Sequence, residues 1–257
     1  MNFIGQTLAL SSDAVNAAAA ALNVPLASIW TVLHVETTGC GFLPDRRPVI
    51  RFERYRFHQH TGGIYDAAHP DISSALPGNV AADGAPQYDL LNKAVALNPQ
   101  AALESTSWGL AQILGENYAL AGFADVMSMV GAMVNSENAQ MDAFRSFIQS
   151  NHLAPHLQAQ NWAAFALGYN GANYQRLHYD TRLAAAFRML SGSAMPNLDI
   201  RAAQLYLTLR GFSPDGIDGK LGPRTMDALR AFQASAGLPQ TGQLDSQTLA
   251  ALNPPAS

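Results

Sequence analysis

The most restrictive feature of the sequence is a run of 22 residues, 14–35, that contains no formally charged side chain. A run of this length is long enough to be considered as a membrane span. However, Pro25 would break a single spanning helix, and polar residues interrupt the run on both sides of it. We therefore predict two helices, over 14–23 and from Pro25 to about Glu36, that pack inside a helical domain without membrane insertion.

The overall composition agrees with closely packed helices. Alanine occurs 44 times, and only 13% of the residues are charged, against about 25% in a typical soluble protein. The hydrophobic content of 48% excludes disorder, and the net charge of −4 offers no basic field for nucleic acid. Cys40 is the single cysteine, so no intramolecular disulfide can form.

The chain divides near residue 190. The sequence Ser-Gly-Ser-Ala-Met-Pro at 191–196 has the composition of a linker, which predicts one domain over 1–190 and a second over 197–257. The second block contains a repeat with an offset of 23 residues, in which each copy has a glycine-containing loop, a threonine and a short apolar helix. We expect each threonine to lie at a helix start and to accept a backbone N–H there. The repeated positions are Gly219, Leu221, Thr225, Ala228 and Leu229, followed by Gly242, Leu244, Thr248, Ala251 and Leu252.

This second block resembles a peptidoglycan-binding module of the three-helix type. The resemblance rests on Leu209-Arg210-Gly211-Phe212, Asp218-Gly219-Lys220-Leu221-Gly222, Phe232-Gln233 and Thr241-Gly242, and it covers about 60 residues. It implies that bacterial peptidoglycan is the partner of the chain, and it leaves open which side chains contact the glycan.

Glu36 is the most distinctive carboxylate of the first block. Ile29, Val32, Leu33 and Glu36 share one helix face, so Glu36 ends an apolar stripe. Burial and the negative end of the helix dipole both raise the pKa of such a carboxyl group. A general acid at neutral pH needs a raised pKa, whereas a simple ion pair with an arginine is the alternative.

Three motifs follow one another in a specific order: Glu36-Thr-Thr-Gly39, then Ser107-Trp-Gly-Leu-Ala-Gln112, then Gly168-Tyr-Asn-Gly171. This order resembles the goose-type lysozyme and lytic transglycosylase superfamily, and within it the N-acetylmuramidase domain of modular phage endolysins. The resemblance extends over nearly all of residues 5–188. It implies a mainly α fold, in which a lysozyme-like helical domain with a small β-hairpin region is joined to the three-helix module.

The resemblance also implies an activity and the residues that perform it. The activity is hydrolysis of the bond between N-acetylmuramic acid and N-acetylglucosamine, with Glu36 as catalytic acid and no cofactor. Ser107 and Gln112 correspond to the sugar-binding cleft, and Tyr169 and Asn170 to the wall near the acid. Amides and phenols can bind N-acetyl and hydroxyl groups by hydrogen bonds, although capping and core packing are alternative roles for them.

The identity of a second catalytic carboxylate is left open. Glu53 lies in an alternating stretch, 49–57, that predicts a strand or hairpin beside the cleft, and Asp45 is a rival. Lytic transglycosylases work with one acid, so that activity is the alternative if Glu53 merely pairs with nearby arginines. These arginines form either a solvated charged face or contacts to peptide-stem carboxylates. They are Arg46, Arg47, Arg51, Arg54 and Arg56.

A metal site is not expected. His34, His58, His60 and Cys40 cluster in the sequence, but neither HExxH nor paired CxxC spacing occurs. A thiol just after a helix end has a raised pKa, so we expect Cys40 to be a small buried residue and not a nucleophile.

The expected protein is a monomeric endolysin. The first basic residue is Arg46, so the N-terminus has no positive region of a signal peptide. We therefore expect synthesis in the cytoplasm and action on the cell wall, in the periplasm, after release. A wall-binding protein with an inactive lysozyme-like domain and a bacterial antagonistic effector are the alternatives.

Overall fold

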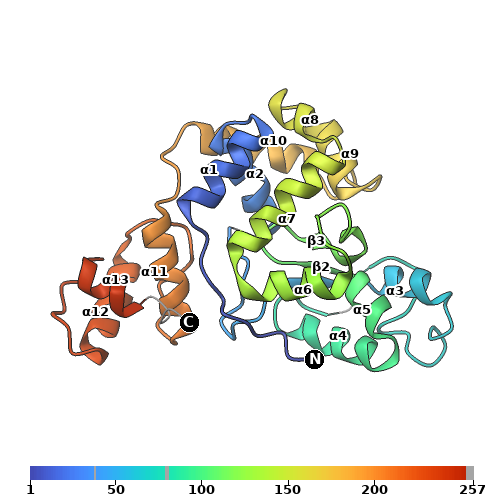
Figure 1. Cartoon of the computed structure of the whole chain (residues 1–257), viewed down its shortest axis with the longest axis horizontal. Coiled ribbons are helices and arrows are strands. Elements are labelled where there is room, and N and C mark those ends of the chain that lie inside the picture. Colours follow the sequence, from blue (N-terminus) through green and yellow to red (C-terminus); the bar gives the residue numbers. More distant parts are fainter. Residues whose placement is uncertain (38, 79–80, 253–257) are drawn as a thin grey trace.

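The computed structural model describes residues 1–37, 39–78 and 81–252. In the described chain, ten α-helices, the 3-10 helix η1 and a small sheet form one unit, and three further helices, α11 to α13, form a second unit at one end of the molecule (Figure 1). The mainly α architecture with a small β region is thus confirmed. Besides those described below, the helices are α4 (Pro86–Leu97), α5 (Pro99–Glu104), η1 (Gly115–Asn117), α6 (Val126–Asn135), α7 (Glu137–Ser150), α8 (Ala154–Gln158), α9 (Trp162–Asn170) and α10 (Tyr179–Ser191).

The uncharged run folds into the two expected helices. They are α1 (Ser12–Leu22) and α2 (Leu26–Thr37), and the chain bends by 110° between them. Ser11 caps α1 by accepting a hydrogen bond from the backbone of Ala14, and Asn23 ends the helix in a left-handed conformation. Within the described residues, no single helix is both long and apolar enough to cross a membrane. Helix α2 is buried along most of its length and forms the centre of the larger unit.

The sheet contains three short antiparallel strands in the order β1 (Ile50–Phe52), β2 (Thr106–Trp108) and β3 (Ile113–Leu114). Strands β2 and β3 form a hairpin, and β1 pairs with β2 so that Arg51 lies opposite Ser107. Partners in such a register have their side chains on the same face of the sheet. The sheet therefore places Arg51 and Ser107 side by side.

The prediction of a strand or hairpin over 49–57 is wrong beyond Phe52. Glu53 precedes helix α3 (Arg54–Thr61), so His58 and His60 lie on a helix and not on a strand. The reason is packing, because Phe52 and Phe57 are both buried with their ring centroids 5.9 Å apart. A helical turn after Glu53 brings both rings into the core, whereas a continued strand would carry Phe57 away from it.

The second unit consists of α11 (Leu198–Leu209), α12 (Pro223–Ser235) and α13 (Ser246–Leu252). Its sequence repeat has a structural cause in two buried glutamines, because each one fills one glycine-containing loop. Gln204 accepts from the backbone of Gly219 at 2.8 Å, and Gln233 accepts from Gly242 at 2.9 Å.

The repeated threonines are not helix caps, contrary to expectation. Thr225 and Thr248 are buried, and their hydroxyl oxygens accept hydrogen bonds from Gln204 and Gln233. The start of α13 is capped instead by Asp245, which accepts from the backbone of Thr248 at 2.7 Å.

Candidate active site

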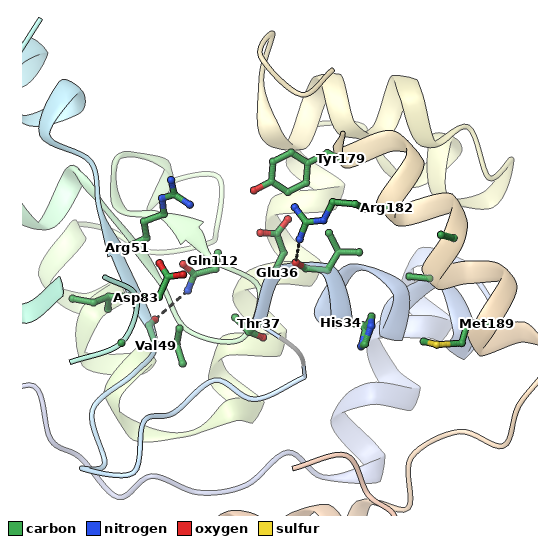
Figure 2. A pocket seen from close by; sticks show the side chains of 15 residues that line it. His34, Glu36, Thr37, Val49, Arg51, Asp83, Gln112, Tyr179, Arg182 and Met189 are labelled. Carbon is green, nitrogen blue, oxygen red and sulfur yellow. Dashed lines mark hydrogen bonds between the residues drawn. The ribbon is translucent and has the colours of Figure 1, made fainter. Parts of the chain in front are cut away.

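A cleft of about 780 Å³ lies between α2 and α10 on one side and the start of β1 on the other. Figure 2 shows Glu36, Tyr179 and Arg182 on the helical side. Arg51 and Gln112 face them from the side of the sheet. Polar and charged side chains from separate parts of the chain thus converge on one cleft.

Glu36 lies in the last turn of α2 and is partly buried at the cleft. Its Oε1 accepts a hydrogen bond of 3.1 Å from Nδ2 of Asn170. Burial raises the pKa of Glu36 from 4.5 to about 7, and this effect exceeds the opposing influence of the Asn170 hydrogen bond and of the positive charges on Arg182 and Arg51. The sequence-based expectation of a raised pKa agrees with this arrangement.

Helix α10 holds the helical wall in place. Arg182 donates from Nη2 to the backbone oxygen of Val35 at 2.8 Å, next to Glu36. Its guanidinium group also lies 5.0 Å from the centroid of the Tyr179 ring. Sequence reasoning missed both cleft residues, because no motif marks α10 and its contacts with α2 join distant parts of the chain.

Gln112 lines the opposite wall from the turn between β2 and β3. It has a positive φ of 51°, and its Nε2 donates to the backbone oxygens of Val49 and Gly109 at 3.1 and 2.9 Å. The amide nitrogen therefore ties the turn to β1, and among the described residues no hydrogen bond occupies the side-chain oxygen. That oxygen is available to a ligand in the cleft.

Tyr169 and Asn170 have different surroundings although they are neighbours. The hydroxyl of Tyr169 donates to the backbone oxygen of Ala111 at 2.6 Å, and its ring packs against Phe165 and two other phenylalanines. Tyr169 thus supports the Gln112 turn from behind. Asn170 contacts Glu36 directly, and its buried Oδ1 has no hydrogen-bond partner among the described residues.

Tyr169 and Asn170 are not among the residues that line the cleft, and the remaining candidates also lie outside its lining. Ser107 is next to Arg51 on the sheet. Glu53 precedes α3, and its Oε1 lies 3.1 Å from Nε of Arg51; burial raises the pKa of this carboxyl group. Asp45 pairs with Arg47 through a hydrogen bond of 2.9 Å. Each of the two alternative carboxylates therefore has an arginine partner.

Asp83 is a cleft carboxylate that sequence reasoning missed. It lines the cleft on the side opposite Glu36, beside Gln112, and is exposed (Figure 2). Within the described part of the chain it makes no ion pair. The Asp83-Gly84 pair is a turn signal, and it predicts a loop without indicating where that loop lies.

The sequence also led to expectations about a metal site and the reactivity of Cys40. The described residues contain no group of three side chains that could hold a metal ion. Cys40 is half-buried, and burial together with the negative charge of Glu137 raises the pKa of its thiol to about 12. A thiol with such a pKa is not a nucleophile at neutral pH.

Comparison with known proteins identifies the larger unit. Residues 25–191 match the N-acetylmuramidase family. The chain belongs to this family. Residues 196–252 of the muramidase match a peptidoglycan binding domain family. Its partner is therefore peptidoglycan, its place of action is the cell wall, and its activity is that of a glycoside hydrolase.

A solved structure is also similar to the chain. The muramidase is 37% identical to the protein in a crystal structure of the Burkholderia AP3 phage endolysin. The match covers 71% of each chain and has a TM-score of 0.63. No curated protein matches the chain significantly.

Proposed function

We propose that Glu36 is the general acid with which this muramidase cleaves the bond between N-acetylmuramic acid and N-acetylglucosamine. The observation that carries the proposal is a partly buried carboxyl group with a pKa of about 7, held by Asn170 at the wall of the cleft. At pH 7 about half of such a group is protonated, whereas an ordinary glutamate has lost almost all of its protons.

The reaction requires a proton for the departing sugar and a nucleophile for the muramic acid carbon. Glu36 donates its proton to the glycosidic oxygen, the bond between this oxygen and C1 breaks, and positive charge develops on the muramic acid ring. Water then attacks C1 and loses a proton to a base. We assign the base to Asp83, because this carboxylate lies across the cleft from Glu36 and carries no paired cation among the described residues.

Glu53 is the second candidate for the base, and its pairing with Arg51 argues against it. A lytic transglycosylase would need neither carboxylate, because the substrate's own hydroxyl group would attack C1.

The polar residues around Glu36 would bind the sugars. The free oxygen of Gln112 can accept hydrogen bonds from N-acetyl or hydroxyl groups of the sugars. Asn170, whose Oδ1 is buried, would act by holding Glu36. Tyr169 and Ser107 are proposed to act from behind these contacts, by supporting the Gln112 turn and by flanking Arg51.

The wider proposal concerns the whole protein. We assign catalysis to residues 1–190 and wall binding to residues 197–257. Similarity to a phage endolysin supports a role as an endolysin that is made in the cytoplasm and acts on the wall after release. We further propose that the protein is a monomer and does not insert into the membrane.

The test compares E36Q, D83N and E53Q with the unaltered protein in a turbidity assay on purified sacculi. Each substitution replaces one carboxylate oxygen by the NH2 group of an amide and keeps the shape of the side chain. We expect loss of lysis for E36Q, a loss of at least about 100-fold for D83N and a small change for E53Q. Full activity of folded E36Q would refute the assignment of the acid.

Mass spectrometry of the released fragments tests the reaction type. Reducing muramic acid ends indicate hydrolysis, and anhydro ends would show transglycosylation. The full-length E36Q protein also tests wall binding, because it should sediment with sacculi without dissolving them. Recovery of this variant in the supernatant would contradict the role of residues 197–257.

A further inference from the structure

A buried ion pair joins the two units of the protein. Arg201 on α11 meets Glu137 on α7, and both side chains are 0% exposed. Nη1 and Nη2 of Arg201 each lie 2.6 Å from one carboxylate oxygen of Glu137. This two-point geometry is the strongest form of arginine–carboxylate contact. The smaller unit thus inserts a charged side chain into the larger one.

The partners of this pair belong to the segment that follows α2. Arg201 donates from Nε to the backbone oxygen of Gly39 at 2.9 Å, and Nη2 donates to the same oxygen. Glu137 accepts from the backbone nitrogen of Gly41 at 2.8 Å and from that of Leu10 at 2.9 Å. The ion pair therefore holds the chain at Gly39 and Gly41 from both sides.

The same segment connects the two walls of the cleft. Gly39 lies three residues after Glu36, and the backbone oxygen of Gly41 accepts from Val49 at 2.8 Å. The oxygen of Val49 in turn accepts from Gln112. A continuous set of hydrogen bonds thus runs from Arg201 through Gly41 to the wall that faces Glu36.

The two glycines cannot position this segment by packing of their own. Gly39 has a φ of 92°, and a Cβ atom added to Gly41 would lie 2.0 Å from Oε1 of Gln140. Because neither glycine has a side chain, the place of these two residues depends on their backbone contacts, whereas Cys40 between them packs against the core. Arg201 supplies the bonds to the Gly39 oxygen.

We propose that Arg201 is a positioning residue for catalysis. The wall-binding unit thereby completes the active site of the catalytic unit. By holding Gly39, Arg201 sets the position of Glu36 relative to the opposite wall of the cleft. This inference rests on the proposed role of Glu36 as the acid. The alternative is that Arg201 only stabilises the fold.

The test uses full-length variants and a soluble oligosaccharide released from peptidoglycan, so that affinity for the intact wall does not enter. R201K keeps the charge but loses the planar fork, since one ammonium group cannot reproduce both contacts. In R201M/E137M two apolar side chains replace the whole pair, and such replacements often preserve folding. This variant also removes the bonds of Glu137 to Gly41 and Leu10, so R201K is the variant that isolates Arg201. The matched controls are R224M, in the exposed pair with Asp215, and D142N, on the exposed side of α7.

We expect R201M/E137M to fold, by near-ultraviolet circular dichroism, and to show a kcat at least tenfold lower with a KM changed less than threefold. The alkaline limb of its kcat/KM profile should also move, because the surroundings of Glu36 change. R201K should show a smaller loss of kcat, and both controls should behave like the unaltered protein.

A folded double variant with unaltered kcat and pH profile would overturn the proposal. Failure of both Arg201 variants to fold would overturn it as well, because the residue would then serve the fold alone. E36Q is assayed in parallel, so that activity in E36Q refutes the proposed acid, whereas an inactive E36Q beside an unaffected R201M/E137M refutes only the inference about Arg201.

Discussion

Replacing Glu36 by glutamine should stabilise the protein at high pH while it abolishes activity. Burial raises the pKa of Glu36 from 4.5 to about 7. The folded protein therefore holds the proton more tightly than the unfolded chain, and the ionised form is the costly one. Glutamine has nearly the same shape, stays neutral at every pH and can still accept the hydrogen bond from Asn170.

The size of the effect follows from the two pKa values. One pKa unit corresponds to about 1.4 kcal/mol, so ionisation of Glu36 costs the folded state about 3 kcal/mol. Linkage predicts that E36Q exceeds the original protein in unfolding free energy by about 0.8 kcal/mol at pH 5 and by about 3 kcal/mol at pH 8. Below pH 4.5 Glu36 is protonated in both the folded and the unfolded protein, so the original protein has its full stability there. It loses this stability relative to E36Q as the pH rises through about 7.

Urea unfolding of both proteins between pH 4 and pH 9 measures this difference. D125N provides a control of opposite sign, because Asp125 caps α6 and hydrogen bonds to Ser128 lower the pKa of its carboxyl group. D125N should lose stability at neutral pH, and its deficit should close as the pH falls through the lowered pKa. A gap between E36Q and the original protein that stays constant with pH would refute the reasoning, since Glu36 would then have an ordinary pKa.

Three further predictions concern single contacts. N170A removes a hydrogen bond that lowers the pKa of Glu36, so the alkaline limb of the kcat/KM profile should move to higher pH. Y169F leaves the backbone oxygen of Ala111 unpaired, and we expect about 1–3 kcal/mol of lost stability in thermal unfolding and a lower kcat because the Gln112 turn loosens. Q204A empties the loop around Gly219 and should destabilise the protein by about 2–4 kcal/mol in urea unfolding.

Two of these predictions, Y169F and Q204A, have a matched control. Y174F removes a hydroxyl group that bonds only the exposed side chain of Gln175 among the described residues, and Q247A removes an exposed glutamine from α13. An alkaline limb that moves to lower pH in N170A would contradict the assigned hydrogen bond. Equal stability losses in Q204A and Q247A would contradict the structural reason given for the repeat.

Local patterns predicted much of the fold and the central residue of the site. Pro25 and the apolar spacing from Ile29 to Glu36 indicated two helices and placed one carboxylate at the end of a buried face. The 23-residue offset indicated a repeated loop and helix before its cause, the pair of buried glutamines, was visible. These features depend on neighbours within a few helical turns, and periodicity records such neighbours directly.

The alternating stretch after Val49 shows where a local pattern misleads. Alternation predicted a strand through Phe57, but the core needed both Phe52 and Phe57, and the chain turned into a helix at Arg54. Packing against the rest of the core overrode the local preference.

The sequence alone determined that a helical unit would present Glu36 and that a repeated module would follow it. Only the tertiary structure decided that Asp83 lies across the cleft from Glu36, that Arg182 lies beside Glu36, and that Arg201 would hold the segment behind it. The contacts of Arg201 with Glu137 and Gly39 join residues 64 and 162 positions apart. Pairs so distant leave no periodic trace in the chain, because their meeting depends on how all the intervening elements pack.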